Sequence, residues 1–417
     1  MSLTLVVGIR QLMSLRGEPV RRGPEAMNDL GLIPSAAMAI EMGRIRAVGP
    51  ESEIRAAFPA ADHELDCGDR LVSPGLIDAH THLLFGGKRL DDFEARLQGR
   101  SYAEIGAAGG GIRSTMRATR ALDLESMLAI GRRHWEACLR CGTTRLEAKS
   151  GYGLNLETEL RLLEAANRLN LEPPTTGRIH STFLGAHAVP PEFEGDRAGY
   201  LDHVIFEMLP QAALRASAVD MFVERGYFEP DDARRLAQAA SGFGLGVRLH
   251  VDQLSEGGGA ELAVELGCLS ADHLEKTSSA GIAAVAQSQT WPILLPASVF
   301  GIGQDHYPNA RAMIDAGLPV VLATDFNPGS SPTPSLPIVM SLACQRMKMT
   351  AAEAWVATTL HAAGALGVAS ESGSLEPGKG ADFVVWDAED YREIPYWFGR
   401  PLVRQVFLAG APAFSMN

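Results

Sequence analysis

Two histidines separated by a single residue, His80 and His82, end the apolar run GLIDAHTHLL and are the first residues that could do chemistry. In an extended chain, residues i and i+2 point to the same side, so both imidazoles are expected to project together. Two imidazoles on one face form half of a typical metal site. Taken alone the pattern is weak, because two hydrogen-bonded structural histidines explain it better than a metal site does.

Three further polar residues stand in the same kind of position, after an apolar run. They are His250 in LHVDQ, His273 in ADHLE and Asp325 in LATDFNPG. A polar group at the end of a buried run costs free energy unless it is paired or binds a ligand. A satisfied buried histidine explains any one of these residues, but it explains all five together poorly. The set therefore predicts a bound metal.

These residues require elements that bring them to one edge of the fold. Between residues 73 and 369 the chain alternates short apolar runs with amphipathic stretches. In one such stretch, Leu156, Leu160, Leu163 and Leu169 recur near helical spacing behind Asn155, which can cap a helix. The eight strand candidates are GLIDAHTHLL, TTRLEAKSG, TFLGAHAV, AVDMFVER, GVRLHVDQL, CLSADHLE, WPILLPAS and PVVLATDFN.

Eight such units predict an α/β fold, a parallel (β/α)8 barrel. An open doubly wound sheet is the rival, but no GxGxxG sequence opens a helix after the first strand. In a barrel, the carboxyl ends of the strands build the active site, which would place all five polar residues on one rim. Residues 1–72 and 370–417 consist of short β-rich runs with turn signals. They are predicted to form one small β-sandwich domain, beside a barrel domain of residues 73–369.

Composition limits the partners. The 417 residues carry a net charge of -13 and no Lys/Arg-rich run, which argues against nucleic acid or an anionic membrane. No apolar run approaches the roughly 18 residues of a membrane span, and the run from Leu3 to Ile9 is expected to be a strand. Five scattered cysteines fit a reducing cytoplasm, and the pair Cys138 and Cys141 has no redox setting around it.

The sequence PGLIDAHTH, together with the later histidines and aspartate, resembles the amidohydrolase superfamily of metal-dependent barrel hydrolases, in which a β domain built from both termini flanks the barrel. The resemblance to one group within it covers almost the whole chain. It runs through RLQGRSYAEIGAAGGGIRSTMRATR, EAKSGYGLNLETEL, TFLGAHAVPPE, LHVDQLSEGGGAELAVELGCLSADHLE, LATDFNPGSSPTPSL and PYWFG.

This resemblance implies hydrolysis of the ring amide of 4-imidazolone-5-propanoate to N-formimino-L-glutamate, in histidine degradation. The alternative is a deaminase of a small nitrogen heterocycle, because the same metal site would serve both. A non-catalytic barrel is a third alternative, but such a protein should have lost metal ligands. The group also implies a homodimer.

The resemblance implies a single Zn²⁺, Fe²⁺ or Fe³⁺ ion. Its ligands would be His80, His82, His250 and Asp325. We expect Asp325 to move the proton of the attacking water and His273 to steady the oxyanion. The implied substrate contacts are Arg89, Tyr152, His187, Gln253, Asn327, Gly329 and Ser330. Independently of the family, a guanidinium such as that of Arg89 suits a propionate carboxylate.

Three features of the sequence depart from the family pattern or bear on the number of metals. Some members of the group have Glu where this chain has Gln253, and an amide cannot act as a base. Glu224 and Lys149 end predicted strands and make a second metal conceivable, although we expect one. The stretch SVFGIGQDHYPNAR around Gly301 differs from the group's usual sequence, which leaves the contacts of that loop open.

Overall fold

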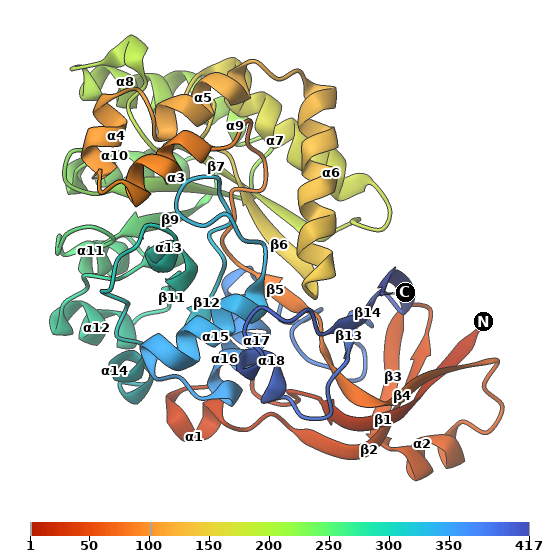
Figure 1. The fold of residues 1–417 in the computed structure, drawn as a ribbon. Helices are drawn as coiled ribbons and strands as arrows, with labels where there is room; N and C mark the ends of the chain where they lie inside the picture. The colour runs from red at the N-terminus through yellow and green to blue at the C-terminus, as the bar shows by residue number, and fades with distance from the viewer. Residues whose placement is uncertain (1, 101, 417) are drawn as a thin grey trace.

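The computed structural model describes residues 2–100 and 102–416. Eight parallel strands form one sheet, in which each strand pairs with the next along the chain (Figure 1). The strands are β5 (Leu76–Asp78), β6 (Thr143–Lys149), β7 (Ile179–Ala186), β8 (Ala218–Val223), β9 (Gly246–Val251), β10 (Ser270–His273), β11 (Trp291–Leu294) and β12 (Val321–Leu322). All eight strand candidates are confirmed. Seven strands are shorter than the run that predicted them, whereas β7 begins three residues before TFLGAHAV and ends before it does.

The barrel closes between β12 and β5 through hydrogen bonds just beyond the two strand ends. The backbone N–H of Asp325 donates to the carbonyl of His80, and the N–H of His82 donates to the carbonyl of Phe326, both at 3.0 Å. The hydrogen bonds that close the barrel therefore also hold three of the predicted metal ligands, His80, His82 and Asp325, next to one another.

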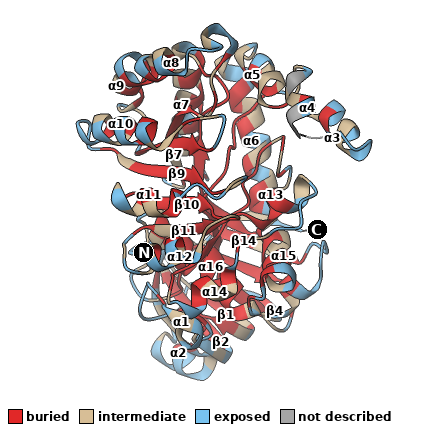
Figure 2. Cartoon of the chain, turned by 90° about the vertical axis from the view of Figure 1, so that its left-hand side faces the viewer, coloured by how far each residue is buried: buried red, intermediate tan, exposed pale blue. Residues whose placement is uncertain are grey.

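Helices surround the barrel, with buried strands inside and exposed outer helical faces (Figure 2). Helix α7 (Leu156–Leu171) begins as predicted, because the side chain of Asn155 accepts a 2.9 Å hydrogen bond from the backbone N–H of Thr158. Leu163 and Leu169 on this helix are buried in the barrel core. The other helices that follow or precede the strands are α6 (Leu124–Arg140), α8 (Arg197–His203), η2 (Val204–Met208), α9 (Leu209–Ala212), α10 (Pro230–Ser241), α11 (Gly259–Glu265), α12 (Ser279–Ala286), α14 (Ala310–Asp315), α15 (Leu336–Met347), α16 (Ala351–Thr358) and α17 (Leu360–Ala365).

Shorter helices occupy the long connections. Those near the rim of the barrel are α3 (Leu90–Leu97), α4 (Tyr102–Ala107), α5 (Ile112–Arg120), η1 (Pro191–Phe193) and α13 (Pro296–Gly301). Those in the terminal segments are α1 (Gly23–Met27), α2 (Glu51–Ala57) and α18 (Glu393–Tyr396). Among the described residues, no helix combines the length and the apolar character that crossing a membrane requires.

Both ends of the chain build a second, seven-stranded sheet in the order β15-β14-β13-β4-β1-β2-β3. Its strands are β1 (Leu3–Met13), β2 (Leu32–Glu41), β3 (Arg44–Pro50), β4 (His63–Pro74), β13 (Phe383–Trp386), β14 (Val403–Leu408) and β15 (Ala411–Ser415). Only β1 and β4 pair in parallel. The sheet curls so far that a Cβ atom at Gly43 would lie 3.0 Å from that of Ala409, which encloses a separate apolar core. The predicted fold class is thereby confirmed.

Candidate active site

The five polar residues predicted from the strand ends meet at one end of the barrel. His80 and His82 follow β5, His250 lies in β9, His273 ends β10 and Asp325 follows β12. All except His80 line a cavity of about 490 Å³. This is the carboxyl end of the parallel strands, the end where barrels of this architecture place their active sites.

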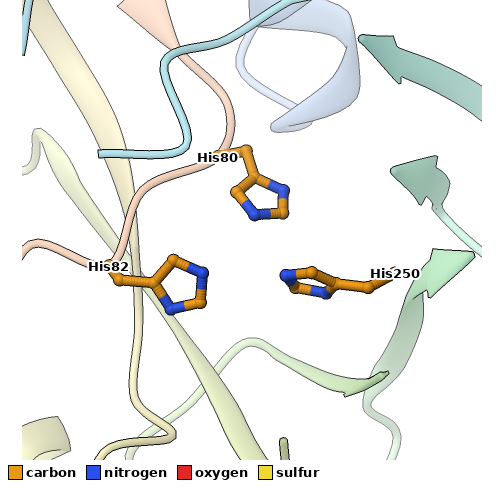
Figure 3. Close-up of side chains that lie close together, drawn as sticks. All are labelled: His80, His82 and His250. Atoms are coloured by element: carbon orange, nitrogen blue, oxygen red, sulfur yellow. The ribbon is translucent and has the colours of Figure 1, made fainter. Parts of the chain in front are cut away.

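Three imidazoles form a cluster able to hold a metal ion. Each of His80, His82 and His250 offers a nitrogen, and these three atoms lie within 4.8 Å of one another. The rings of His80 and His82 come from the segment after β5 and face that of His250 from β9, as Figure 3 shows. The Nε2 atoms of His80 and His250 are buried and have no hydrogen-bond partner among the described residues. Buried nitrogens left without partners, pointing at a shared space, fit a metal ligand set.

The opposite nitrogens of two of these rings are held by carboxylates. Nδ1 of His80 lies 2.6 Å from Oδ2 of Asp272, and Nδ1 of His250 lies 3.1 Å from Oδ1 of Asp220. Carboxylates that accept from Nδ1 fix the tautomer in which Nε2 is free to bind a metal. Burial is the main cause that lowers the pKa of His80 well below its usual value and that of His250 to about 4. Both rings are therefore neutral at physiological pH, which is the form that binds a metal.

Asp325 can complete the ligand set. Its Oδ1 atom lies 3.4 Å from Nε2 of His82 and 3.6 Å from Nε2 of His80. Its Oδ2 atom accepts a 3.1 Å hydrogen bond from the hydroxyl of Ser330. Burial raises the pKa of Asp325, but the hydrogen bond and charge of His82 and the charge of His273 outweigh burial and lower the pKa to about 2. The carboxylate is thus ionised and can accept a proton.

His273 stands beside the cluster and pairs with an acid of its own. Its Nδ1 atom lies 3.3 Å from Oε1 of Glu275, and both side chains are buried. Burial lowers the pKa of His273, but the negative charge and hydrogen bond of Glu275, together with the charges of Asp325 and Asp272, exceed that effect, so the net shift is upward. His273 and Asp325 both have positive φ, 86° and 53°, which non-glycine residues seldom adopt. Such backbone strain occurs where a fold must aim a side chain at a functional site.

The predicted substrate contacts gather around the same cavity. The side chains that line it are those of Arg89, Tyr152, His187, Gln253, Asn327 and Ser330. Gly329 is adjacent, because a Cβ atom at this position would collide with the guanidinium of Arg89. The structure therefore brings all seven residues together, while their contacts with a substrate remain predictions.

The loop around Gly301 and the carboxylate of Glu224, whose roles the sequence left open, both have definite contacts. Gly301 packs against the carbonyl of Ser330, leaving no room for a side chain, and the following Ile302 and Gln304 line the cavity. Both carboxylate oxygens of Glu224 accept hydrogen bonds from the loop after β9, from the backbone N–H groups of Leu254 (2.8 Å) and Ser255 (3.2 Å) and from the Ser255 hydroxyl. Glu224 therefore supports a loop.

Lys149, the other residue considered for a second metal, is buried and ion-paired. Its Nζ atom lies 2.6 Å from Asp220, 2.9 Å from Glu147 and 3.5 Å from Asp272. Burial lowers the pKa of Lys149, but the three carboxylates together reverse that effect and raise the net pKa. The ammonium is therefore charged, and a charged ammonium cannot be a metal ligand.

Sequence reasoning missed the carboxylates that contact the imidazoles, namely Asp220, Asp272 and Glu275, and the buried pair of Glu147 and Arg248 next to Lys149. A signal was present for the first two, since each carboxylate interrupts a run predicted to be a buried strand, in AVDMFV and LSADHL. It also missed Arg96 and Arg100, which line the cavity beside Arg89.

Comparisons with known proteins agree with this geometry. The amidohydrolase family pattern matches residues 224–412. The chain is 50% identical to imidazolonepropionase of Solibacter usitatus over 98% of each chain. It is 48% identical to imidazolonepropionase of Geobacillus kaustophilus, covering 94% of this chain and 93% of that one.

Solved structures share the fold at low sequence identity. Guanine deaminase of E. coli has a TM-score of 0.73 at 15% identity, with 100% of both chains covered. The 5-methylcytosine deaminase of Klebsiella pneumoniae has a TM-score of 0.74 at 15% identity, covering 99% of this chain and 98% of that one. These structural likenesses concern the fold alone. The sequence identities to the two imidazolonepropionases, which cover nearly the full length, assign the chain to a narrower family. The chain belongs to the imidazolonepropionase family of the amidohydrolase superfamily.

Proposed function

We propose that this chain hydrolyses the ring amide of 4-imidazolone-5-propanoate to N-formimino-L-glutamate, a step of histidine degradation. The observation that carries the proposal is the composition of the cavity. On one side stand the neutral imidazoles of His80 and His250, whose Nε2 atoms have no partner among the described residues, and on the other stands Arg89, which forms no ion pair with any described residue. A cyclic amide that carries a carboxylate matches both sides.

The proposed metal ligands are His80, His82, His250 and Asp325, and the ion is Zn²⁺ or iron. When bound there, the ion supplies a Lewis acid that polarises the amide carbonyl and lowers the pKa of a water molecule. The chain contributes the neutral state of the imidazoles and their fixed orientation, through Asp272 on His80 and Asp220 on His250.

The substrate is oriented by groups at two ends of the cavity. The guanidinium of Arg89 pairs with the propionate carboxylate, while its Nε donates a 2.8 Å hydrogen bond to Thr115, which holds the side chain in place. Tyr152 and His187 lie on the imidazole side, with ring centroids 5.4 Å apart, and present polar edges to the substrate. Asn327 and Ser330 hydrogen-bond to each other at 2.9 Å and bind the heterocycle.

Two side chains handle protons and charge during ring opening. Asp325 accepts a proton from the attacking water and delivers it to the ring nitrogen when the carbon–nitrogen bond breaks. His273, with its net pKa raised, donates a hydrogen bond to the carbonyl oxygen as negative charge develops there. Gln253 lines the cavity as a hydrogen-bonding group and takes no proton. The five cysteines, none of them in a disulfide, support a cytoplasmic location.

The test is a spectrophotometric assay on freshly prepared imidazolone propionate, with and without a chelator. Loss of the ring absorbance with formation of N-formimino-L-glutamate, abolished by chelation and restored by Zn²⁺ or Fe²⁺, is expected. Stable imidazolone in the presence of metal-loaded protein would refute the proposal. Ammonia release from an amino-substituted heterocycle, with the imidazolone untouched, would assign a deaminase instead.

A further inference from the structure

We propose that Lys149 is a positioning residue for the metal site. Its ammonium fixes two carboxylates inside the barrel, and each of these carboxylates orients one metal-binding imidazole. The inference rests on the proposed metal site and adds the residue that ties two of its ligands together.

Two short chains of contacts start at the ammonium. In the first, Lys149 Nζ lies 2.6 Å from Oδ2 of Asp220, and that same oxygen lies 3.1 Å from Nδ1 of His250. In the second, Nζ lies 3.5 Å from Oδ2 of Asp272, and that oxygen lies 2.6 Å from Nδ1 of His80. Each chain thus passes from one cation through one carboxylate to one imidazole.

The contacts span the interior of the barrel. Lys149 ends β6, Asp220 lies in β8 and Asp272 lies in β10, and all three side chains are fully buried. Water is therefore not available to replace a lost partner, and the ammonium is the bridge between carboxylates that come from opposite sides of β9.

Charge balance shows why the bridge matters. Three buried carboxylates lie within 4 Å of the Lys149 ammonium, and a second cation, Arg248, contacts one of them, Glu147, at 3.1 Å. Without Lys149, Asp220 and Asp272 would face each other with no cation between them, in a medium of low dielectric constant where like charges repel strongly. Removing one partner of a buried ion pair leaves the remaining charge uncompensated. The carboxylates would turn apart, and His80 and His250 would lose their fixed orientation.

The substitution Lys149→Met removes the charge and keeps most of the side-chain volume. We expect the affinity of the full-length protein for Zn²⁺, measured by competition with a chromophoric chelator, to fall by about 10–100-fold, as is typical when the partner of a metal-binding histidine is lost. In ¹⁵N-histidine NMR spectra of the same variant, the Nδ1–H signals of His80 and His250 should broaden or shift, a change that an effect on stability alone would not produce.

Two controls separate positioning from general stability. Glu147→Gln removes a buried charge that contacts Lys149 at 2.9 Å but pairs with no imidazole of the metal cluster, and it should leave Zn²⁺ affinity near that of the wild type. Arg178→Met breaks the 2.7 Å ion pair with Asp382, which joins the start of β7 to the terminal sheet. It should lower the melting temperature without changing Zn²⁺ affinity.

The outcomes distinguish this inference from the proposed function. If the wild type binds no Zn²⁺, the proposed metal site itself fails. If the wild type binds and folded Lys149→Met binds equally well, or if either control weakens binding as much, the positioning role is overturned. Should Lys149→Met not fold, the double variant Lys149→Met/Glu147→Gln keeps the net charge of the interior. Its Zn²⁺ affinity should be lower than that of Glu147→Gln alone, and equal affinities would overturn the role.

Discussion

At the scale of single residues, some side chains of the site are arranged only to bind a metal, whereas Asp325 can also accept a proton. His80 and His250 each commit one nitrogen to a carboxylate and keep the other free. Asp325 differs, because its two oxygens lie beside His82 and Ser330 while the side chain still lines the cavity. One carboxylate can therefore contact the ion and an attacking water together, which makes Asp325 the residue on which turnover should depend most.

Replacing this carboxylate by an amide tests the assignment. Asp325→Asn keeps the shape but cannot accept a proton, so kcat should fall by roughly 10²–10⁴-fold, the range for loss of a general acid–base group. Zn²⁺ content is measured on the same sample, since the amide is also a weaker ligand. Affinity for the product, followed by calorimetry, should change little. Ser330→Ala removes a hydrogen bond to this carboxylate and one with Asn327, together with a proposed substrate contact, so it should raise KM but lower kcat far less than Asp325→Asn. Near-normal turnover by a metal-loaded Asp325→Asn protein would contradict the assignment.

Arg89 should determine affinity for the substrate. Loss of a charged hydrogen bond is worth about 1.5–3 kcal/mol, so Arg89→Ala should raise KM by roughly 10–150-fold with a smaller change in kcat. The matched comparison is an imidazolone that lacks the propionate, on which the wild type and the variant should perform alike. An equal loss on both substrates would remove Arg89 from this role. Arg113→Ala, whose wild-type side chain is paired with Glu194, is a surface control.

How much of this site was predictable depends on where each partner lies in the sequence. His80 and His82 carry their own signal, because they are two residues apart, and each remaining ligand follows an apolar run. The partners Asp220 and Asp272 are 30 and 192 residues from the imidazoles that they orient. No local pattern encodes that pairing, since it arises only when the barrel brings distant strands together.

At the scale of elements, a buried carboxylate shapes the turn that carries Tyr152. Glu159, in the first turn of α7, accepts hydrogen bonds from the backbone N–H groups of Gly151 (2.9 Å), Gly153 (2.7 Å) and Leu154 (2.8 Å). An acidic side chain in the first turn of a helix is also favoured by the helix dipole. The turn that presents Tyr152 to the cavity is thus held by the helix that follows it.

The substitution Glu159→Gln should loosen this turn. The amide has one acceptor oxygen in place of two, so at least one buried N–H loses its partner, at a cost of about 1–3 kcal/mol in the free energy of unfolding. KM should rise several-fold while kcat changes less, because the turn orients substrate and takes no part in proton transfer. Urea unfolding and steady-state kinetics measure the two effects. Glu157→Gln, on the exposed face of the same helix, should leave both unchanged. Unaltered KM in a destabilised Glu159→Gln protein would reduce Glu159 to a structural residue.

The barrel strands show that apolar runs in the sequence predict where a strand lies but not where it ends. The runs predicted all eight, yet β12 contains only Val321–Leu322, because the chain after it leaves the ladder to place Asp325. An apolar run in the sequence indicates that its residues are buried, and burial continues beyond the last hydrogen bond of the strand. Such runs therefore place the end of a strand too late in the sequence. In this protein the candidate metal ligands lie at or just after those strand ends.

At the scale of the whole molecule, the two sheets were predicted from different signals. Alternating strands and helices indicated the barrel, and turn-rich ends indicated the terminal β unit, whereas the contacts between them had no signal in the sequence. Trp386 of β13, for instance, packs edge-on against Trp355 of α16, with ring centroids 5.6 Å apart. The boundaries at residues 72/73 and 369/370 stay predictions.

His361 links the N-terminal segment to the barrel through two hydrogen bonds, which it can make together only when its ring is neutral. Its Nε2 atom accepts a 3.1 Å hydrogen bond from the backbone N–H of Arg21, while its Nδ1 atom donates to the carbonyl of Val320 at 2.9 Å. Burial, and to a smaller extent the charges of Arg21 and Arg22, lowers the pKa of His361 to about 4. An added proton would occupy the nitrogen that must accept, and would break the link.

Stability should consequently fall as the pH decreases through the range set by this histidine. Well above pH 6.5 His361 is neutral in both the folded and the unfolded chain, so it adds no pH dependence there. Between pH 6.5 and 4 the unfolded chain takes up a proton that the folded chain refuses, which should reduce the free energy of unfolding by about 2 kcal/mol at pH 5. His361→Gln can keep both hydrogen bonds without titrating, so its urea-unfolding curves should lose that much less stability than the wild type between pH 7.5 and 5. His63→Gln, at an exposed position, is the matched control and should follow the wild type. If the wild type and His361→Gln lost the same free energy of unfolding between pH 7.5 and 5, other groups would govern acid unfolding. Protonation of His361 would then not separate the N-terminal segment from the barrel.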